Sequence, residues 1–258
     1  MFLDDPLISN IIFYPRSHAI PSRLDEKTKI LKFEMADGVL IGGFFFQNDP
    51  KLPTILLFHG NGELAIEYQH FRGLFFQCGV NLAAIDFRGY GFSSGDPRFS
   101  KLYEDAFVIY EHFVDWIKSQ GLNQSVFVLG RSLGSTCAAE IGSHNPSNLK
   151  GIIFESGIGS SYRIMTQLFN VNVPEAQKDL LKEWSNDIRA TKFQKPTLII
   201  HGTNDWIVDP EHATILFEAV PSDVQKKLVM IKGAGHNDIF QFEGEYFGAL
   251  KEFIQKNK

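Results

Sequence analysis

The chain has 258 residues, of which 44% are hydrophobic, which is enough for one large α/β domain with a substantial core. The formal net charge is −5 with both signs interspersed, which excludes the basic surface typical of nucleic-acid-binding proteins. The two cysteines, Cys78 and Cys137, show neither C-x-x-C nor zinc-ligand spacing. We therefore expect no disulfide framework and no structural metal.

The N-terminal region does not resemble a signal peptide, because Asp4 and Asp5 stand where basic residues are expected. No apolar run is long enough to span a bilayer. A short apolar stretch from Leu7 to Tyr14 ends at Pro15. We expect it to pack on the domain itself, with membrane contact as the alternative, and we expect a cytoplasmic protein without membrane association.

Strands and helices alternate along most of the chain. Two β-rich runs, 29–35 and 39–46, are joined by Ala36-Asp37-Gly38, which predicts an antiparallel hairpin. Continuous apolar runs then predict buried strands at 54–58, 80–85, 126–129, 151–154, 197–200 and 227–231. Helical patterns occupy 63–78, 102–119, 135–143, 211–220 and 244–255. Such alternation predicts an α/β fold, with a mostly parallel central sheet, right-handed crossovers and helices on both faces.

Residues 157–191 interrupt this alternation with Ser156-Gly157, Asn170 to Pro174 and a helix-like segment from Glu175 to Trp184. We interpret the interruption as a short cap inserted at about 157–191. The chain is therefore predicted to be a single domain over 1–258, carrying the N-terminal hairpin and this cap.

A nucleophile motif follows the predicted strand 126–129. The pentapeptide has the Gly-x-Ser-x-Gly pattern and precedes a helix: Gly130-Arg131-Ser132-Leu133-Gly134. In a strand–turn–helix context, this tight turn requires small flanking residues and raises the serine hydroxyl above the sheet. Ser132 is therefore the predicted nucleophile.

Two partners for Ser132 follow later strands. Functional groups of parallel sheets gather at the carboxyl ends of the strands. His236 lies in a glycine-rich turn after 227–231, and Asp205 lies just past 197–200. Histidine has a suitable pKa for a general base, and a carboxylate fixes its tautomer. We predict a Ser132–Asp205–His236 triad, in the chain order of α/β-hydrolases.

Other polar residues at strand ends compete for these roles. Glu155 is the alternative acid, because it ends the strand after the nucleophile helix. Asp209 and Asp238 are weaker candidates, each interpreted as a helix-cap or loop residue. His59 and His201 both precede a glycine at a strand end, and we expect them to make structural hydrogen bonds.

Acyl transfer also needs hydrogen-bond donors for the developing oxyanion. The backbone N–H of Leu133 is one predicted donor. The loop His59-Gly60-Asn61-Gly62 follows strand 54–58, and the backbone N–H of Asn61 is the second. Apolar cap residues are candidates for substrate contact, with packing of the cap onto the core as the alternative: Tyr162, Met165, Phe169 and Trp184.

Together these motifs resemble the α/β-hydrolase superfamily of serine hydrolases, from about Thr54 to Asp238. The matching segments, in order, are Phe58 to Gly62, Asp86 to Ser93, Gly130 to Gly134, His201 to Asp205 and Gly235-His236. The Arg-Gly-Tyr-Gly-x-Ser stretch and the short cap are most similar to the Bem46-like and acyl-protein-thioesterase-like subgroup. This resemblance implies a reaction class rather than a substrate. Membrane-anchored members carry an N-terminal helix or a palmitoylated cysteine cluster, which the sequence lacks.

The predicted activity is hydrolysis of a small-molecule ester or acyl substrate through an acyl-serine, with no metal or organic cofactor. Acyl thioesterase or depalmitoylase and amidase or peptidase activities share the triad and stay open, as does the oligomeric state. A non-catalytic binding protein on the same fold is an alternative of another class. A dinucleotide-binding oxidoreductase is disfavoured, because the glycines from Gly89 to Gly95 have G-x-G-x-x-x-G spacing.

Overall fold

The computed structural model describes residues 2–258 and contains an eight-stranded sheet in the order β1-β2-β4-β3-β5-β6-β7-β8. The hairpin strands β1 and β2 are antiparallel, β2 is antiparallel to β4, and the remaining neighbours are parallel. This arrangement confirms the predicted α/β-hydrolase fold. The strands are β1 (Thr28–Glu34), β2 (Leu40–Phe46), β3 (Thr54–Phe58), β4 (Asn81–Ile85), β5 (Val126–Arg131), β6 (Leu149–Glu155), β7 (Thr197–Gly202) and β8 (Lys226–Ile231).

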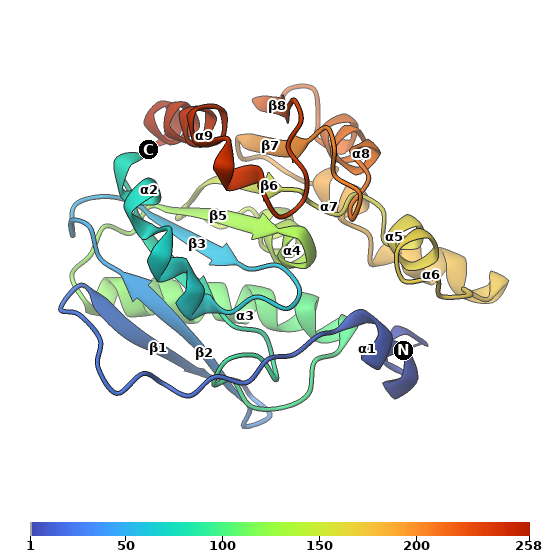
Figure 1. Cartoon of the computed structure of the whole chain (residues 1–258), viewed down its shortest axis with the longest axis horizontal. Helices are drawn as coiled ribbons and strands as arrows, with labels where there is room; N and C mark the ends of the chain where they lie inside the picture. The colour runs from blue at the N-terminus through green and yellow to red at the C-terminus, as the bar shows by residue number, and fades with distance from the viewer. Residues whose placement is uncertain (1) are drawn as a thin grey trace.

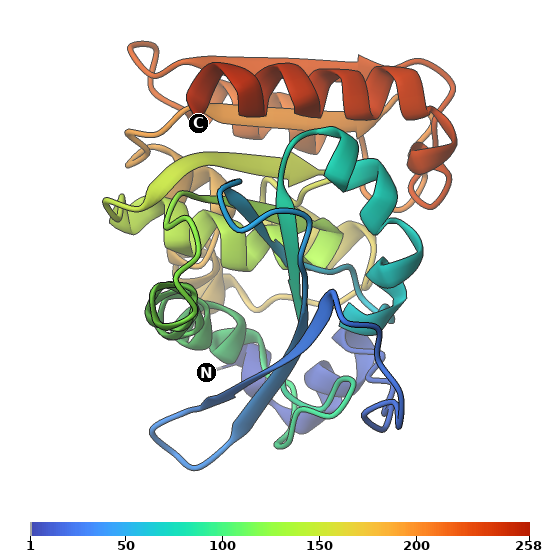
Figure 2. The same ribbon diagram turned by 90° about the vertical axis from the view of Figure 1, so that its left-hand side faces the viewer.

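Helices cover both faces of the sheet (Figures 1 and 2). Helices α2 and α9 pack together on one face, and α3, α4 and α8 lie on the other. Every residue of β3, β4, β5 and β7 is buried, which explains the continuous apolar runs of these strands. The helices are α1 (Pro6–Ile12), α2 (Arg72–Gln77), α3 (Phe99–Ser119), α4 (Ser135–His144), α5 (Ser161–Gln167), α6 (Lys178–Glu183), α7 (Asn186–Ala190), α8 (Glu211–Ala219) and α9 (Glu243–Asn257), with short 3₁₀ segments η1 (Phe2–Asp4), η2 (Ala65–His70), η3 (Ser132–Gly134), η4 (Glu175–Gln177) and η5 (Ile239–Gln241).

The continuous helix expected over 63–78 is instead the 3₁₀ segment η2 followed by the short helix α2. The Glu67 side chain accepts a hydrogen bond from the backbone N–H of Leu64 and pairs with Arg16, which favours a tight local turn. Gly73, near the start of α2, further lowers helix propensity. Local side-chain bonding thus replaces a regular helix here.

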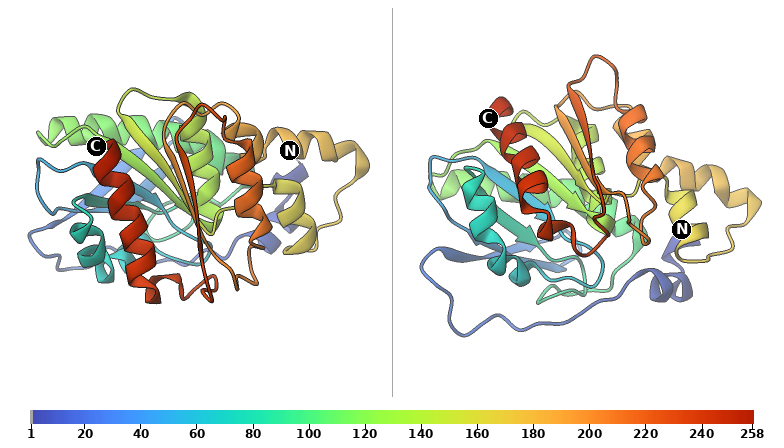
Figure 3. Two further views of the ribbon diagram at one scale, coloured as in Figure 1. Left: turned by 90° about the horizontal axis from the view of Figure 1, so that it is seen from above. Right: turned by 45° about the horizontal axis from the view of Figure 1, so that its top comes forward.

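The segment between β6 and β7 contains α5, η4, α6 and α7, and α5 and α6 project beyond one end of the sheet beside α1 (Figure 3). The α7 end of the cap is anchored to the body. The Asn186 side-chain amide donates to the Ser135 hydroxyl of α4 at 3.3 Å, and the Arg189 guanidinium lies 4.0 Å from the ring centre of Tyr103 in α3. Within residues 2–258, no helix combines the length and apolar character that crossing a membrane requires.

Candidate active site

Ser132 occupies a sharp turn between β5 and α4. Its φ of +48° lies in the left-handed region, which costs a non-glycine residue about 1–3 kcal/mol and is characteristic of functional sites. A Cβ atom at Gly130 would lie 2.5 Å from the Gly134 carbonyl oxygen, and one at Gly134 would overlap the Phe58 carbonyl. Both flanking positions therefore require glycine.

His236 and Asp205 are hydrogen-bonded at the carboxyl edge of the sheet. His236 Nδ1 lies 2.8 Å from Asp205 Oδ2. The other carboxylate oxygen accepts hydrogen bonds from the backbone N–H groups of Ile207 and Val208, each at 2.9 Å. Burial opposes ionisation of Asp205, but hydrogen bonds from His201 and His236 hold its pKa well below the usual value. An ionised Asp205 is suited to orienting the His236 ring.

Glu155, the rival acid, is committed to other partners. It is fully buried, with Oε1 accepting from Arg131 at 2.6 Å and Oε2 from the Tyr246 hydroxyl at 2.8 Å. Burial raises the pKa of Glu155, while the neighbouring Arg131 opposes that rise. With both oxygens occupied, Glu155 is placed to hold Arg131, and Asp205 holds His236.

Arg131, the residue before the serine, joins three parts of the site and was not singled out by the sequence. Its guanidinium binds Glu63 Oε1 and Glu155 Oε1, each at 2.6 Å, and donates to the His236 carbonyl oxygen at 3.1 Å. Glu63 also accepts from the Gly60 backbone N–H at 2.8 Å. The available signal was a charged residue at the end of a buried strand, since such a residue needs partners.

A pocket of about 310 Å³ opens at this edge. It brings together four of the residues predicted for the triad and the oxyanion hole, with Glu63 and Arg131 at its polar side: Asn61, Ser132, Leu133 and His236. Most of the remaining wall is apolar: Tyr14, Ile158, Ile164, Leu168, Phe169, Ile207 and Val208. A small, mainly apolar cavity with a few convergent polar groups is the usual form of a substrate site.

Of the four cap residues predicted to contact substrate, Phe169 lines this pocket. The other three lie outside its lining. Tyr162 lies beneath the Lys178 ammonium at 5.7 Å, Met165 is buried, and Trp184 packs edge-on against Tyr103 at 5.0 Å. These three side chains hold the cap together and onto the body, as in the alternative interpretation.

The remaining candidates make local hydrogen bonds. His59 Nδ1 lies 2.8 Å from the Gly60 carbonyl oxygen, and His201 Nε2 lies 2.8 Å from the Val208 carbonyl oxygen. Asp209 accepts from the Glu211 backbone N–H at the start of α8, and Asp238 accepts from that of Gly235. Across residues 2–258, the structure groups no three His, Cys, Asp or Glu side chains in a way that could hold a metal ion.

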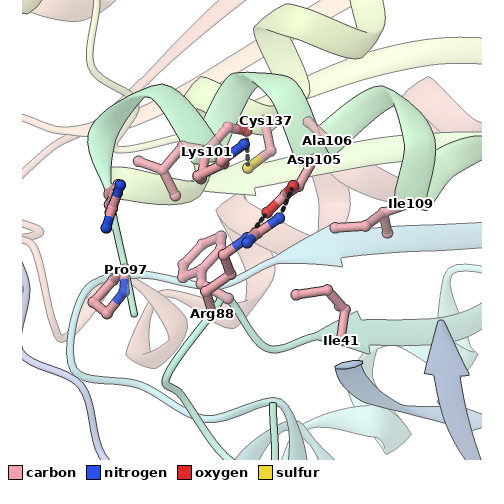
Figure 4. A pocket seen from close by; sticks show the side chains of 11 residues that line it. Ile41, Arg88, Pro97, Lys101, Asp105, Ala106, Ile109 and Cys137 are labelled. Carbon is pink, nitrogen blue, oxygen red and sulfur yellow. Dashed lines mark hydrogen bonds and ion pairs between the residues drawn. The ribbon is translucent and has the colours of Figure 1, made fainter. Parts of the chain in front are cut away.

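A second, much smaller pocket lies beside α3 (Figure 4). Its volume is about 20 Å³, room for about one water molecule, and the ion pair between Arg88 and Asp105 runs along it. The Cys137 thiol there donates to the Leu102 carbonyl at 3.2 Å, and burial raises its pKa well above the usual value. Neither the volume nor the protonated thiol suits this pocket to substrate chemistry.

Comparisons with known proteins agree with this architecture. The model of the family described as serine aminopeptidase, S33, matches residues 49–184 and 186–243. Human alpha/beta hydrolase domain-containing protein 17B is 28% identical over 239 residues, covering 91% of this chain and 78% of the human protein. The solved Pyrococcus furiosus esterase Pf2001 has a TM-score of 0.74 at 18% identity, covering 95% of this chain and 97% of the esterase. Est1E from Butyrivibrio proteoclasticus, solved with ferulic acid, has a TM-score of 0.69 at 19% identity, covering 88% and 98%.

Proposed function

The chain belongs to the serine aminopeptidase S33 family of hydrolases, and from this premise we propose that it cleaves carboxylic esters through an acyl-serine intermediate. Ser132 is the proposed nucleophile, His236 the general base and Asp205 the orienting acid. The observation that carries the proposal is a serine on a strained turn in the same pocket as a histidine bound to a buried carboxylate.

In the proposed mechanism, His236 Nε2 takes the proton from Ser132 Oγ as the oxygen attacks the ester carbonyl carbon. The backbone N–H groups of Leu133 and Asn61 stabilise the resulting oxyanion. The protonated His236 gives its proton to the leaving alkoxide, and the C–O bond of the ester breaks. His236 then deprotonates a water that attacks the acyl-serine, and the proton returns to Ser132 as the acid leaves.

The pocket wall supports an acyl or aryl group as the bound part of a small-molecule substrate. Most of its lining is apolar, and its volume of about 310 Å³ corresponds to about ten water molecules. Glu63 is the acidic residue among the described lining, and it is already ion-paired with Arg131 at 2.6 Å. An aminopeptidase must bind a free α-ammonium group, and this pocket offers no unpaired carboxylate for it, so the geometry favours an ester.

The test is hydrolysis of p-nitrophenyl esters, from acetyl to palmitoyl, by the wild type and Ser132→Ala. We expect turnover to fall by at least about 10³-fold in Ser132→Ala, because the acyl-serine cannot form, while the unfolding temperature is retained. An equal rate in both proteins would refute the assignment. Activity on aminoacyl p-nitroanilides but not on esters would replace the esterase by a peptidase using the same residues.

A further inference from the structure

The Asn61 side chain makes three hydrogen bonds, although the role predicted for this residue uses its backbone N–H. Asn61 Oδ1 accepts from the Tyr90 hydroxyl at 2.6 Å and from the Tyr14 backbone N–H at 3.0 Å. Asn61 Nδ2 donates to the Ile12 carbonyl oxygen at 2.6 Å. Tyr90 is fully buried, and its hydroxyl also accepts from the Tyr14 N–H at 3.1 Å. The loop is thereby connected both to the core and to the N-terminal segment.

Residues 12–18, termed here the N-terminal strip, cross the loop 59–62 and continue along Gly91. Arg16 donates to the Gly62 carbonyl at 2.8 Å and pairs with Glu67 through both guanidinium NH₂ groups. The Arg16 carbonyl accepts from the Gly91 N–H, and the Gly91 carbonyl accepts from the His18 N–H, both at 2.8 Å. The strip is therefore held by hydrogen bonds to Asn61 itself, to Gly62 and to Gly91.

The loop needs such support because Asn61 stands between two glycines. Gly62 has a φ of +75°, and glycine restricts the backbone less than any other residue. Within the described chain, the hydrogen bonds do not include one from the Asn61 backbone N–H, and Asn61 lines the pocket beside Ser132. An oxyanion donor must lie within about 2.7–3.1 Å of the developing charge, and an error of about 1 Å costs about 100-fold in rate.

We propose that the Asn61 side chain, the Tyr90 hydroxyl and the N-terminal strip form a positioning device for the oxyanion hole. The side-chain amide fixes the plane of the loop, so that the Asn61 N–H keeps its direction into the pocket. Tyr90 and the strip act through Asn61 and do not touch the substrate. This inference rests on the proposed esterase function.

A positioning role differs measurably from a purely structural one. Misdirection of an oxyanion donor weakens transition-state binding, so kcat falls while KM changes little. A purely structural contact would lower the unfolding temperature and leave the kcat of the folded enzyme unchanged. Affinity for a boronic acid, which forms a tetrahedral adduct with the serine, should follow kcat because it uses the same donors.

The experiment compares Asn61→Ala, Asn61→Asp and Tyr90→Phe with the wild type in the full chain. Asn61→Ala removes all three side-chain bonds and keeps the backbone N–H, whereas Asn61→Asp keeps the acceptor oxygen for Tyr90 and Tyr14. The matched control is Tyr110→Phe, which removes a buried hydroxyl that has no partner in the described structure. The readouts are kcat and KM on a p-nitrophenyl ester, the dissociation constant of phenylboronic acid, and the unfolding temperature.

We expect kcat to fall about 10- to 100-fold in Asn61→Ala and about 3- to 10-fold in Tyr90→Phe, with KM within about twofold. Asn61→Asp should recover part of the loss, boronic acid affinity should fall in parallel, and Tyr110→Phe should match the wild type. Asn61→Ala or Tyr90→Phe with wild-type kcat, in an enzyme whose activity depends on Ser132, overturns the positioning device alone. If Asn61→Ala does not fold, Tyr90→Phe and Asn61→Asp decide by the same criterion. A wild type without Ser132-dependent hydrolysis overturns the esterase function and this inference with it.

Discussion

At the scale of single residues, the two buried carboxylates of the site differ in their hydrogen-bond partners. Asp205 receives two backbone N–H groups and the His236 ring, whereas Glu155 receives Arg131 and the Tyr246 hydroxyl. The first set stabilises the charge of Asp205, which faces His236, the proposed general base. Glu155 instead pairs with the buried Arg131, whose unpaired charge would be costly.

Substitution of each carboxylate by its amide should therefore affect different properties. Asp205→Asn should lower kcat by about 10³- to 10⁴-fold, because the amide no longer holds the His236 ring in the tautomer that accepts the serine proton. The free energy of unfolding of Asp205→Asn should stay close to that of the wild type, although its kcat falls. The measurement is kcat on a p-nitrophenyl ester together with urea unfolding.

Glu155→Gln is the matched variant. It should lower the free energy of unfolding by about 2–4 kcal/mol, because Arg131 loses a fully buried partner, and should retain far more activity than Asp205→Asn. The reverse pattern, with activity kept in Asp205→Asn and lost in Glu155→Gln, would make Glu155 the catalytic acid.

Parallel strands align their carboxyl ends, so residues that directly follow different strands are expected to lie near one another. Ser132, Asn61 and His236 each follow a different strand and line the same cavity. The sequence could not predict the Arg131 network or the hydrogen bonds of the Asn61 side chain. Arg131 and His236 lie 105 residues apart, and their contact depends on how two loops approach one another rather than on any local pattern.

At the scale of elements, the strands were predictable and the segments outside the sheet were less so. A strand covered on both faces is apolar over most of its length, which leaves a clear signal in β3, β5 and β7. The 63–78 region shows the opposite case, since its pattern fits a helix but Glu67 binds the backbone of Leu64. Three of the four cap residues predicted to contact substrate likewise lie outside the pocket lining, a distinction that an apolar composition does not make.

The junction between the cap and α8 depends on a neutral histidine. His212 Nδ1 accepts from the backbone N–H groups of Gly159 and Ser160, at 3.0 and 3.2 Å, just before α5. Burial, assisted by the nearby Arg163, lowers the pKa of His212 to about 4 from 6.5. Protonation would abolish the acceptor and place a charge in a buried site.

This arrangement predicts a pH-dependent stability. Between pH 6.5 and 4 the unfolded chain binds a proton at this histidine and the folded chain does not, so stability falls as the pH falls. His212 should account for about 3 kcal/mol across that window. We expect the free energy of unfolding, measured with urea at several pH values, to fall less steeply in His212→Gln. Parallel curves for the two proteins would contradict the assignment.

At the scale of the whole molecule, the pocket is assembled from distant parts of the chain. The N-terminal strip supplies Tyr14, the cap supplies Leu168 and Phe169, and the loop after β7 supplies Ile207. Figures 1 and 3 show α1 and α5 at the same end of the sheet. The size of this pocket is therefore set by how the cap and the strip lie over the sheet edge.

Enlarging the cap side of this pocket should change the preferred acyl chain. Phe169→Ala removes an aromatic wall, so we expect the optimum among p-nitrophenyl esters to move to longer chains, with changes of about 10-fold or more in kcat/KM. Trp184→Phe is the matched control, because Trp184 packs on Tyr103 outside the pocket lining. Equal chain-length profiles for the wild type and Phe169→Ala would show that another wall limits the substrate.

The Arg131 network determines when, during synthesis, the region around Ser132 can be fully formed. Arg131 binds Glu63, which lies 68 residues earlier in the chain, and the His236 carbonyl, which lies 105 residues later. Its partner Glu155 binds Tyr246, which lies 91 residues after Glu155. During synthesis the nucleophile turn emerges long before these last partners, and domains fold as units from the N-terminus. The buried guanidinium gains its full set of partners only after residues 236–246 have been synthesised. A chain truncated before His236 would lack the carbonyl that Arg131 binds, and one truncated before Tyr246 would lack the hydroxyl that Glu155 accepts from.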